Sequence, residues 1–145
     1  MKIFAVHQSG ERTLRYSFPA KIDSDTHLRV VMLSNLIRKI PNVSEVVNGY
    51  NTVTVYVNHE RNVPLVKKTI LKSWETSSIE HKSFGKLHII PVFYNGEDLE
   101  QLAHAKNLTV KQVIELHTSV EYTVYMIGFL PGFPYLGELD ERLHI

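Results

Sequence analysis

The sequence contains no cysteine. This absence excludes disulfide bonds, thiolate nucleophiles and zinc or iron–sulfur sites held by cysteine. Long hydrophobic runs are lacking as well, since no stretch reaches the roughly 20 apolar residues that cross a membrane. The apolar run at the start of the chain is also too short for a signal peptide. We therefore expect a soluble, cytoplasmic protein without a membrane partner.

Several standard catalytic and cofactor motifs are also missing. The sequence has no phosphate-binding G-x-x-x-x-G-K-[ST] loop, no G-x-G-x-x-G fingerprint and no G-x-S-x-G nucleophile elbow. Its eight histidines form no His-x-His or His-x-x-x-His pair, so we expect no metal site. No cofactor is therefore expected to bind through a motif of this chain.

The net charge is only +1, but the charges are unevenly distributed. Residues 1–96 carry 13 basic and 7 acidic side chains, whereas residues 97–145 carry 3 and 8. Two short helices predicted around Asn107 have the outline of a helix-turn-helix. The second helix offers only Lys111 and Gln112 for DNA contacts, and it lies in the acidic part. A packed helical hairpin without a nucleic-acid partner is therefore the favoured interpretation.

The first part of the chain predicts an α+β domain over residues 1–82. Its alternating and helical periodicities indicate a strand, a helix, two strands and a second helix. One more strand, over either 87–93 or 2–6, would complete a ferredoxin-like sandwich. A polar stretch then predicts a linker and a boundary near residues 78–86. The predicted elements are a strand over 13–18, a helix from Asp23 or Ser24 to about Ile40, strands over 43–49 and 52–58, and a helix capped by Asn62 with Val66, Ile70 and Trp74 on its inner face.

The second part, residues 86–145, begins with a predicted edge strand over 86–94. A short helix over 97–106 follows, and then the capping box of Thr109 and Gln112 predicts another helix that ends near His117. The side chain of His117 is interpreted either as a cation favoured by the helix dipole or as a ligand contact. A strand over 120–130 completes the pattern.

An unusual loop follows this strand. Residues 128–137, Gly-Phe-Leu-Pro-Gly-Phe-Pro-Tyr-Leu-Gly, combine three glycines, two prolines and three aromatic residues. In a structural interpretation the glycines and prolines fix the backbone while Phe129, Phe133 and Tyr135 fill a core. In a functional interpretation the exposed N–H groups cradle an anion and the aromatic rings form a wall for a small ligand.

Three segments resemble the KipI family, which is also named allophanate hydrolase subunit 1 or PxpB, the B component of 5-oxoprolinase. They are residues 92–100 (VFYNGEDLE), 113–117 (VIELH) and 125–137 (YMIGFLPGFPYLG). The resemblance implies an α+β N-terminal domain followed by a cyclophilin-like β-barrel domain. It also implies that residues 86–145 are only the first part of this barrel, because family members extend beyond the position of Ile145. Glu138 departs from the pattern, since a second glycine is common there.

The resemblance further implies a subunit of a hydrolase that uses ATP to open 5-oxo-L-proline to L-glutamate. The partners would be a sister subunit of the KipA type, which is the C component, and a LamB/YcsF-type subunit. ATP would be used by the assembled complex, so the chain alone is expected to be inactive. Two alternatives are a KipI-type inhibitor of a sporulation sensor histidine kinase and allophanate hydrolase subunit 1. The catalytic residues stay unassigned, and the expected substrate-binding residues are His117, Gly128, Phe129, Pro131, Gly132, Phe133, Tyr135 and Gly137.

Overall fold

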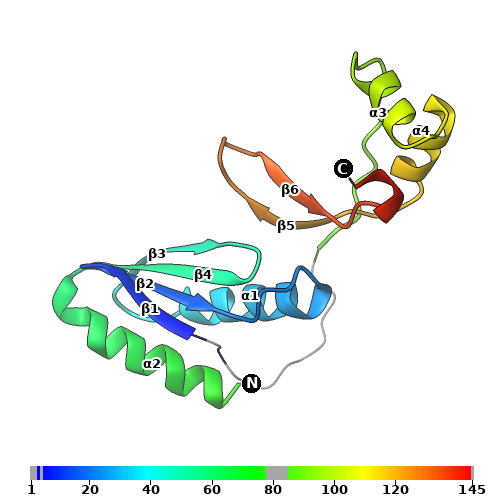
Figure 1. Ribbon diagram of the computed structural model, residues 1–145. Coiled ribbons are helices and arrows are strands. Elements are labelled where there is room, and N and C mark those ends of the chain that lie inside the picture. Colours follow the sequence, from blue (N-terminus) through cyan, green and yellow to red (C-terminus); the bar gives the residue numbers. More distant parts are fainter. Residues whose placement is uncertain (1–2, 4, 78–84, 145) are drawn as a thin grey trace. The chain divides into compact units, whose positions relative to one another are not determined.

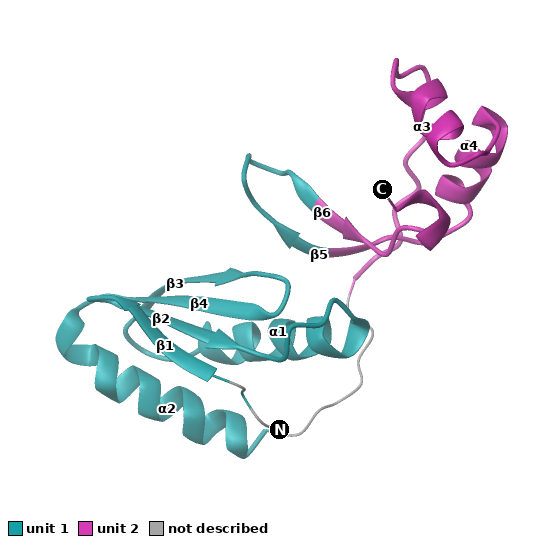
Figure 2. Cartoon of the chain, in the orientation of Figure 1, with its two compact units in different colours: residues 1–84, 125–134 teal, residues 85–124, 135–145 magenta. Residues whose placement is uncertain are grey.

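The structure is a computed structural model that describes residues 3, 5–77 and 85–144 (Figure 1). The chain divides into two compact units (Figure 2). Unit 1 comprises residues 1–84 and 125–134, and unit 2 comprises residues 85–124 and 135–145. Most of the linker predicted near 78–86 lies outside the described residues.

Unit 1 contains a four-stranded antiparallel sheet with the strand order β1-β2-β4-β3. Helices α1 and α2 lie on the same side of this sheet (Figure 1). The strands alternate between buried and more exposed residues, which is the pattern of a sheet covered on one face. The elements are β1 (Ala5–Gly10), β2 (Thr13–Ser17), α1 (Ser24–Ile37), β3 (Val43–Asn48), β4 (Thr52–Val57), the 3-10 turn η1 (Glu60–Asn62) and α2 (Val63–Glu75).

The sequence pattern predicted the inner face of α2 correctly, whereas on α1 the predicted stripe of Leu28, Val31, Met32, Leu36 and Ile40 is wrong, because the buried face is formed by Val30, Leu33 and Ile37. Val66, Ile70 and Trp74 recur at helical spacing on α2 and all three are buried, as predicted. Trp74 packs against Phe18 with ring centroids 5.8 Å apart. The rest of the core comes from the inner faces of the sheet and α1, together with the start of α2: Leu14, Tyr16, Val30, Leu33, Ile37, Val46, Val53, Val55, Val57 and Val63.

Helix α1 begins where the sequence predicts and ends earlier. The Asp23 side chain accepts a hydrogen bond from the backbone N–H of Thr26 at 2.7 Å, which confirms the N-cap. This bond lowers the pKa of Asp23. The helix ends at Ile37 instead of the predicted Ile40. The N–H groups of residues 39 and 40 donate to the carbonyl groups three residues earlier, which is the hydrogen-bond pattern of a 3-10 turn.

Unit 2 has two short helices packed around a small core. Helix α3 (Leu99–Ala105) and helix α4 (Val110–Thr118) enclose Ala103, Val113 and Leu143 from the 3-10 turn η2 (Glu141–Leu143). The predicted capping box at the start of α4 is confirmed, since Thr109 and Gln112 bond reciprocally. The predicted helical hairpin is also confirmed, because α3 and α4 contact each other directly.

The strand predicted over 86–94 is wrong. These residues form no strand, and Ile89 and Phe93 are 90% and 83% exposed. Their alternating apolar pattern fits a strand, but a strand also needs a neighbour that pairs with its backbone groups. None of the described residues supplies such a neighbour. The additional strand of unit 1 is β1 instead, which begins later than the alternative prediction over residues 2–6.

Candidate functional site

The unusual loop forms the tip of a β-hairpin. Strand β5 (Thr123–Ile127), which is shorter than the strand predicted over 120–130, pairs with β6 (Pro134–Gly137). The N–H of Gly128 donates to the carbonyl of Phe133 at 3.1 Å and closes the loop. Inside it, Leu130 donates to Gly128 and Phe133 donates to Leu130. The loop is therefore held by its own backbone hydrogen bonds.

Two residues of the tip have left-handed backbone conformations. Gly132 has φ of 78°, which glycine adopts readily, and Phe129 has φ of 67°, which is rare for a residue with a side chain. The rings of Phe129 and Phe133 meet edge to face with centroids 6.2 Å apart. Phe129 is nevertheless 84% exposed and Phe133 is 44% exposed. The interpretation that these rings fill a core is therefore wrong, and the tip presents an apolar surface.

Tyr125, at the middle of β5, packs within unit 1. Only 3% of Tyr125 is exposed, and its ring lies 5.1 Å from that of His27 and 5.9 Å from that of Tyr50. The sequence pattern placed Tyr125 in a strand and did not single it out. Its position in the middle of an apolar strand gave no sign of its partners, which lie far earlier in the chain.

Burial makes His27 sensitive to pH. It lies in the first turn of α1, and burial lowers its pKa from the ordinary 6.5. Its Nδ1 atom is buried and has no hydrogen-bond partner among the described residues. The folded unit therefore favours the neutral form of this ring, which packs edge to face on the ring of Tyr125.

We expect unit 1 to lose stability as the pH falls through 6.5. Because the folded state lowers the pKa of His27, the unfolded chain binds a proton more readily than the folded unit does. Acidic solution therefore stabilises the unfolded chain relative to the folded unit. Urea unfolding at pH 7.5 and pH 5.5, followed through the fluorescence of the single tryptophan, Trp74, measures this loss. A His27→Phe variant keeps an aromatic ring and should show a smaller loss. An equal loss in both proteins would contradict the role of His27.

His117 lies at the end of α4 in unit 2, between two tyrosines. Its Nδ1 is 2.6 Å from the phenol oxygen of Tyr94, and the two rings meet edge to face. The Tyr122 phenol donates a hydrogen bond to the backbone carbonyl of His117 at 2.8 Å, and its ring centroid is 5.3 Å from the imidazole. The sequence pattern pointed to His117 but not to either tyrosine, because a spacing of 23 residues between Tyr94 and His117 follows no local periodicity.

Acidic and basic groups border this cluster. Burial, followed by the neighbouring Tyr94 and Asp140, raises the pKa of Tyr122, so its phenol stays protonated at neutral pH. Asp140 accepts two side-chain hydrogen bonds from Arg142, at 2.9 and 2.8 Å. These bonds, together with one from the backbone N–H of Arg142, lower the pKa of Asp140 to about 2. The Asp140 carboxylate is thus already paired with the Arg142 guanidinium.

The eight expected site residues fall into two sets. Residues 128–133 belong to unit 1, whereas His117, Tyr135 and Gly137 belong to unit 2. Within the first set, Gly128 and Phe133 are joined by a hydrogen bond, and Phe129 and Phe133 are in ring contact. It stays a prediction that these two sets of residues form one substrate site.

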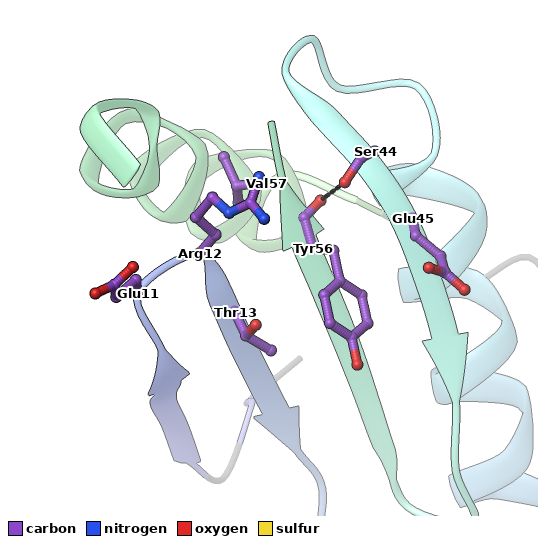
Figure 3. Close-up of a pocket in the computed structure, with 7 residues that line it drawn as sticks. All are labelled: Glu11, Arg12, Thr13, Ser44, Glu45, Tyr56 and Val57. Atoms are coloured by element: carbon purple, nitrogen blue, oxygen red, sulfur yellow. Dashed lines mark hydrogen bonds between the residues drawn. The ribbon is translucent and has the colours of Figure 1, made fainter. Parts of the chain in front are cut away.

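A separate surface hollow lies at one end of the sheet of unit 1 (Figure 3). It has a volume of about 410 Å³, and Ser44 donates across it to the carbonyl of Tyr56 at 3.0 Å. Figure 3 shows one guanidinium, from Arg12, and two carboxylates, from Glu11 and Glu45, so charges of both signs line the hollow. Its lining is Glu11, Arg12, Thr13, Ser44, Glu45, Tyr56 and Val57, which includes none of the expected site residues.

Neither a metal centre nor a membrane span is found in the part of the chain that the structure describes. No group of three or more histidine, aspartate or glutamate side chains there is arranged to hold a metal ion. None of the helices among those residues is long and apolar enough to cross a bilayer.

Residues 4–145 match the family described as "Carboxyltransferase domain, subdomain C and D", and the chain belongs to this family. It is 36% identical over 140 residues to the B component of the 5-oxoprolinase of Escherichia coli O157:H7, covering 93% of this chain and 63% of that protein. It is 51% identical over 57 residues to the B component of the 5-oxoprolinase of Bacillus subtilis (strain 168), covering 37% of this chain and 24% of that protein. The chain thus spans less than two thirds of these curated relatives.

Solved structures show the same fold. The crystal structure of TTHA0988 in space group P6522 superposes with a TM-score of 0.74 at 26% sequence identity. This match covers 92% of the present chain and 26% of TTHA0988. The comparisons therefore confirm the resemblance to the family of 5-oxoprolinase B components, and with it a mixed α/β fold.

Proposed function

We propose that this chain serves as the B component of an ATP-dependent 5-oxoprolinase, which opens 5-oxo-L-proline to L-glutamate. The observation that carries the proposal is the 36% identity over 140 residues to a protein named as this component of 5-oxoprolinase. Since the sequence has no phosphate loop and no recognisable nucleophile, ATP is used by the assembled complex and this chain alone is inactive. A sister subunit of the KipA type, which is the C component, and a LamB/YcsF-type subunit complete the enzyme.

The hairpin tip is suited to form one wall of a shared site. Its rings are exposed, and its backbone is held by hydrogen bonds between Gly128, Leu130 and Phe133. A preformed apolar wall can receive a small ring such as that of 5-oxoproline without first being ordered. We therefore assign substrate contacts to the tip residues Gly128, Phe129, Pro131, Gly132 and Phe133. His117, Tyr135 and Gly137 are proposed as substrate contacts on the resemblance to the family alone.

The finer description of the fold belongs to the same proposal. The order β1-β2-β4-β3, with helices after β2 and β4, is that of a ferredoxin-like sandwich in which β1 takes the place of the last strand. We propose this description for an N-terminal domain over residues 1–82. Residues 86–145 are then the first part of a cyclophilin-like barrel, which accounts for the unpaired apolar segment over 87–93.

Reconstitution tests the function. The chain is mixed with purified sister subunits of the KipA and LamB/YcsF types from the same organism, and L-glutamate and ADP are measured with 5-oxo-L-proline as substrate. We expect glutamate only when all three proteins and ATP are present. Turnover of equal rate without this chain would overturn the proposal.

A further inference from the structure

The ring of His117 is held in one orientation by groups from two other segments. Tyr94, in the extended segment before α3, contacts Nδ1, whereas Tyr122 bonds to the backbone carbonyl of His117. Tyr94 is half-buried, although its neighbours Val92 and Phe93 are exposed. Tyr94 is therefore the point at which this otherwise exposed segment meets the end of α4.

The direction of the hydrogen bond between Tyr94 and His117 depends on the tautomer of the imidazole. The phenol oxygen and Nδ1 are 2.6 Å apart. A phenol O–H is a stronger hydrogen-bond donor than an imidazole N–H, and an unprotonated imidazole nitrogen is a stronger acceptor than a phenol oxygen. We therefore take the Tyr94 phenol as the donor and Nδ1 as the acceptor. A neutral imidazole that accepts at Nδ1 carries its hydrogen at Nε2.

We propose that Tyr94 is a positioning residue that holds His117 as the Nε2–H tautomer, so that Nε2–H donates a hydrogen bond to an oxygen of the substrate. The ligand class is a small carboxylate or cyclic amide, and the substrate part of the proposal rests on the proposed function. Nε2 makes no hydrogen bond with the described residues, which leaves this donor available. A neutral donor can polarise a carbonyl oxygen or bind a carboxylate without giving up its proton.

The hydrogen bond between Tyr94 and the His117 ring is not required to complete the end of α4. The end of α4 is already completed without it, by the bond from Tyr122 to the His117 carbonyl and by side-chain bonds from Thr118 and Ser119. The bond from Tyr94 instead acts on the ring, which is the reactive part of His117. Hydrogen bonds of this kind to the second nitrogen fix the tautomer and orientation of functional histidines.

The tautomer can be measured on the chain itself, without turnover. Two-bond ¹H–¹⁵N correlation spectra of the histidine-labelled protein distinguish a protonated from an unprotonated ring nitrogen. We expect Nε2–H for His117 in the wild type and a mixture of tautomers in Tyr94→Phe, which keeps the ring but lacks the donor. Tyr122→Phe is the matched control and should leave the tautomer unchanged. Nδ1–H in the wild type, or an unchanged tautomer in Tyr94→Phe, would overturn the positioning role.

Turnover in the reconstituted complex tests the consequence for catalysis. Tyr94→Phe is expected to lower kcat/KM for 5-oxoproline by about tenfold, the lower end of the loss seen when the partner that orients a metal-ligating histidine is removed. A wild-type rate in Tyr94→Phe would overturn the role of the tautomer in substrate binding. A wild-type complex that releases no glutamate would instead overturn the proposed function, while the spectra still decide whether Tyr94 sets the tautomer.

Discussion

Replacing Trp74 with alanine is expected to destabilise unit 1 by about 3–5 kcal/mol, the usual cost of removing a large buried aromatic side chain. Trp74 is 2% exposed and packs on Phe18 in the core. Its Nε1 has no hydrogen-bond partner among the described residues, so the loss comes from packing. Because small domains are stable by only about 5–15 kcal/mol, a large share of the stability would disappear.

Leu65→Ala provides the matched control for this change. Leu65 lies on the same helix, α2, but is 59% exposed, so its truncation should change the stability by less than about 0.5 kcal/mol. Urea unfolding followed by far-UV circular dichroism compares both variants with the wild type, since Trp74→Ala lacks the fluorescent probe. Equal midpoints for the two variants would contradict the assignment of Trp74 to the core.

The elements predicted correctly are those whose causes are local in the sequence. Val66, Ile70 and Trp74 share one helix face because of their spacing, and the capping box of Thr109 and Gln112 needs only a single turn. Local patterns of this kind are strong enough to set the position of an element. They do not set where every element ends, as the early end of α1 shows.

Apart from the early end of α1, the failures concern features that depend on distant residues. The segment over 87–93 has the alternation of a strand, but a strand forms only where another strand pairs with it. The loop over 128–137 was recognised by its composition, yet composition does not decide whether Phe129 and Phe133 lie inside or outside. The tyrosines around His117 were missed for the same reason, because tertiary packing brings them together.

The hairpin tip should be sensitive to a change as small as one methyl group. Gly132 has φ of 78°, and a Cβ added there would meet no atom within 4 Å. Gly132→Ala therefore introduces no clash, and its effect comes from the strain of a left-handed conformation in alanine. The backbone relieves this strain by moving, and it carries the adjacent Phe133 with it.

We expect Gly132→Ala and Phe133→Ala to lower turnover of 5-oxoproline by about a hundredfold in the reconstituted complex, the loss that a displacement of about 1 Å can cause in a positioned site. Gly85→Ala is the matched control, because Gly85 also has a positive φ, of 116°, and open space around its Cβ position, but lies outside the hairpin. Native mass spectrometry must show the same subunit composition for all variants. Wild-type turnover with either tip variant would contradict the assignment of the tip to the substrate site, because the apolar wall would then be dispensable.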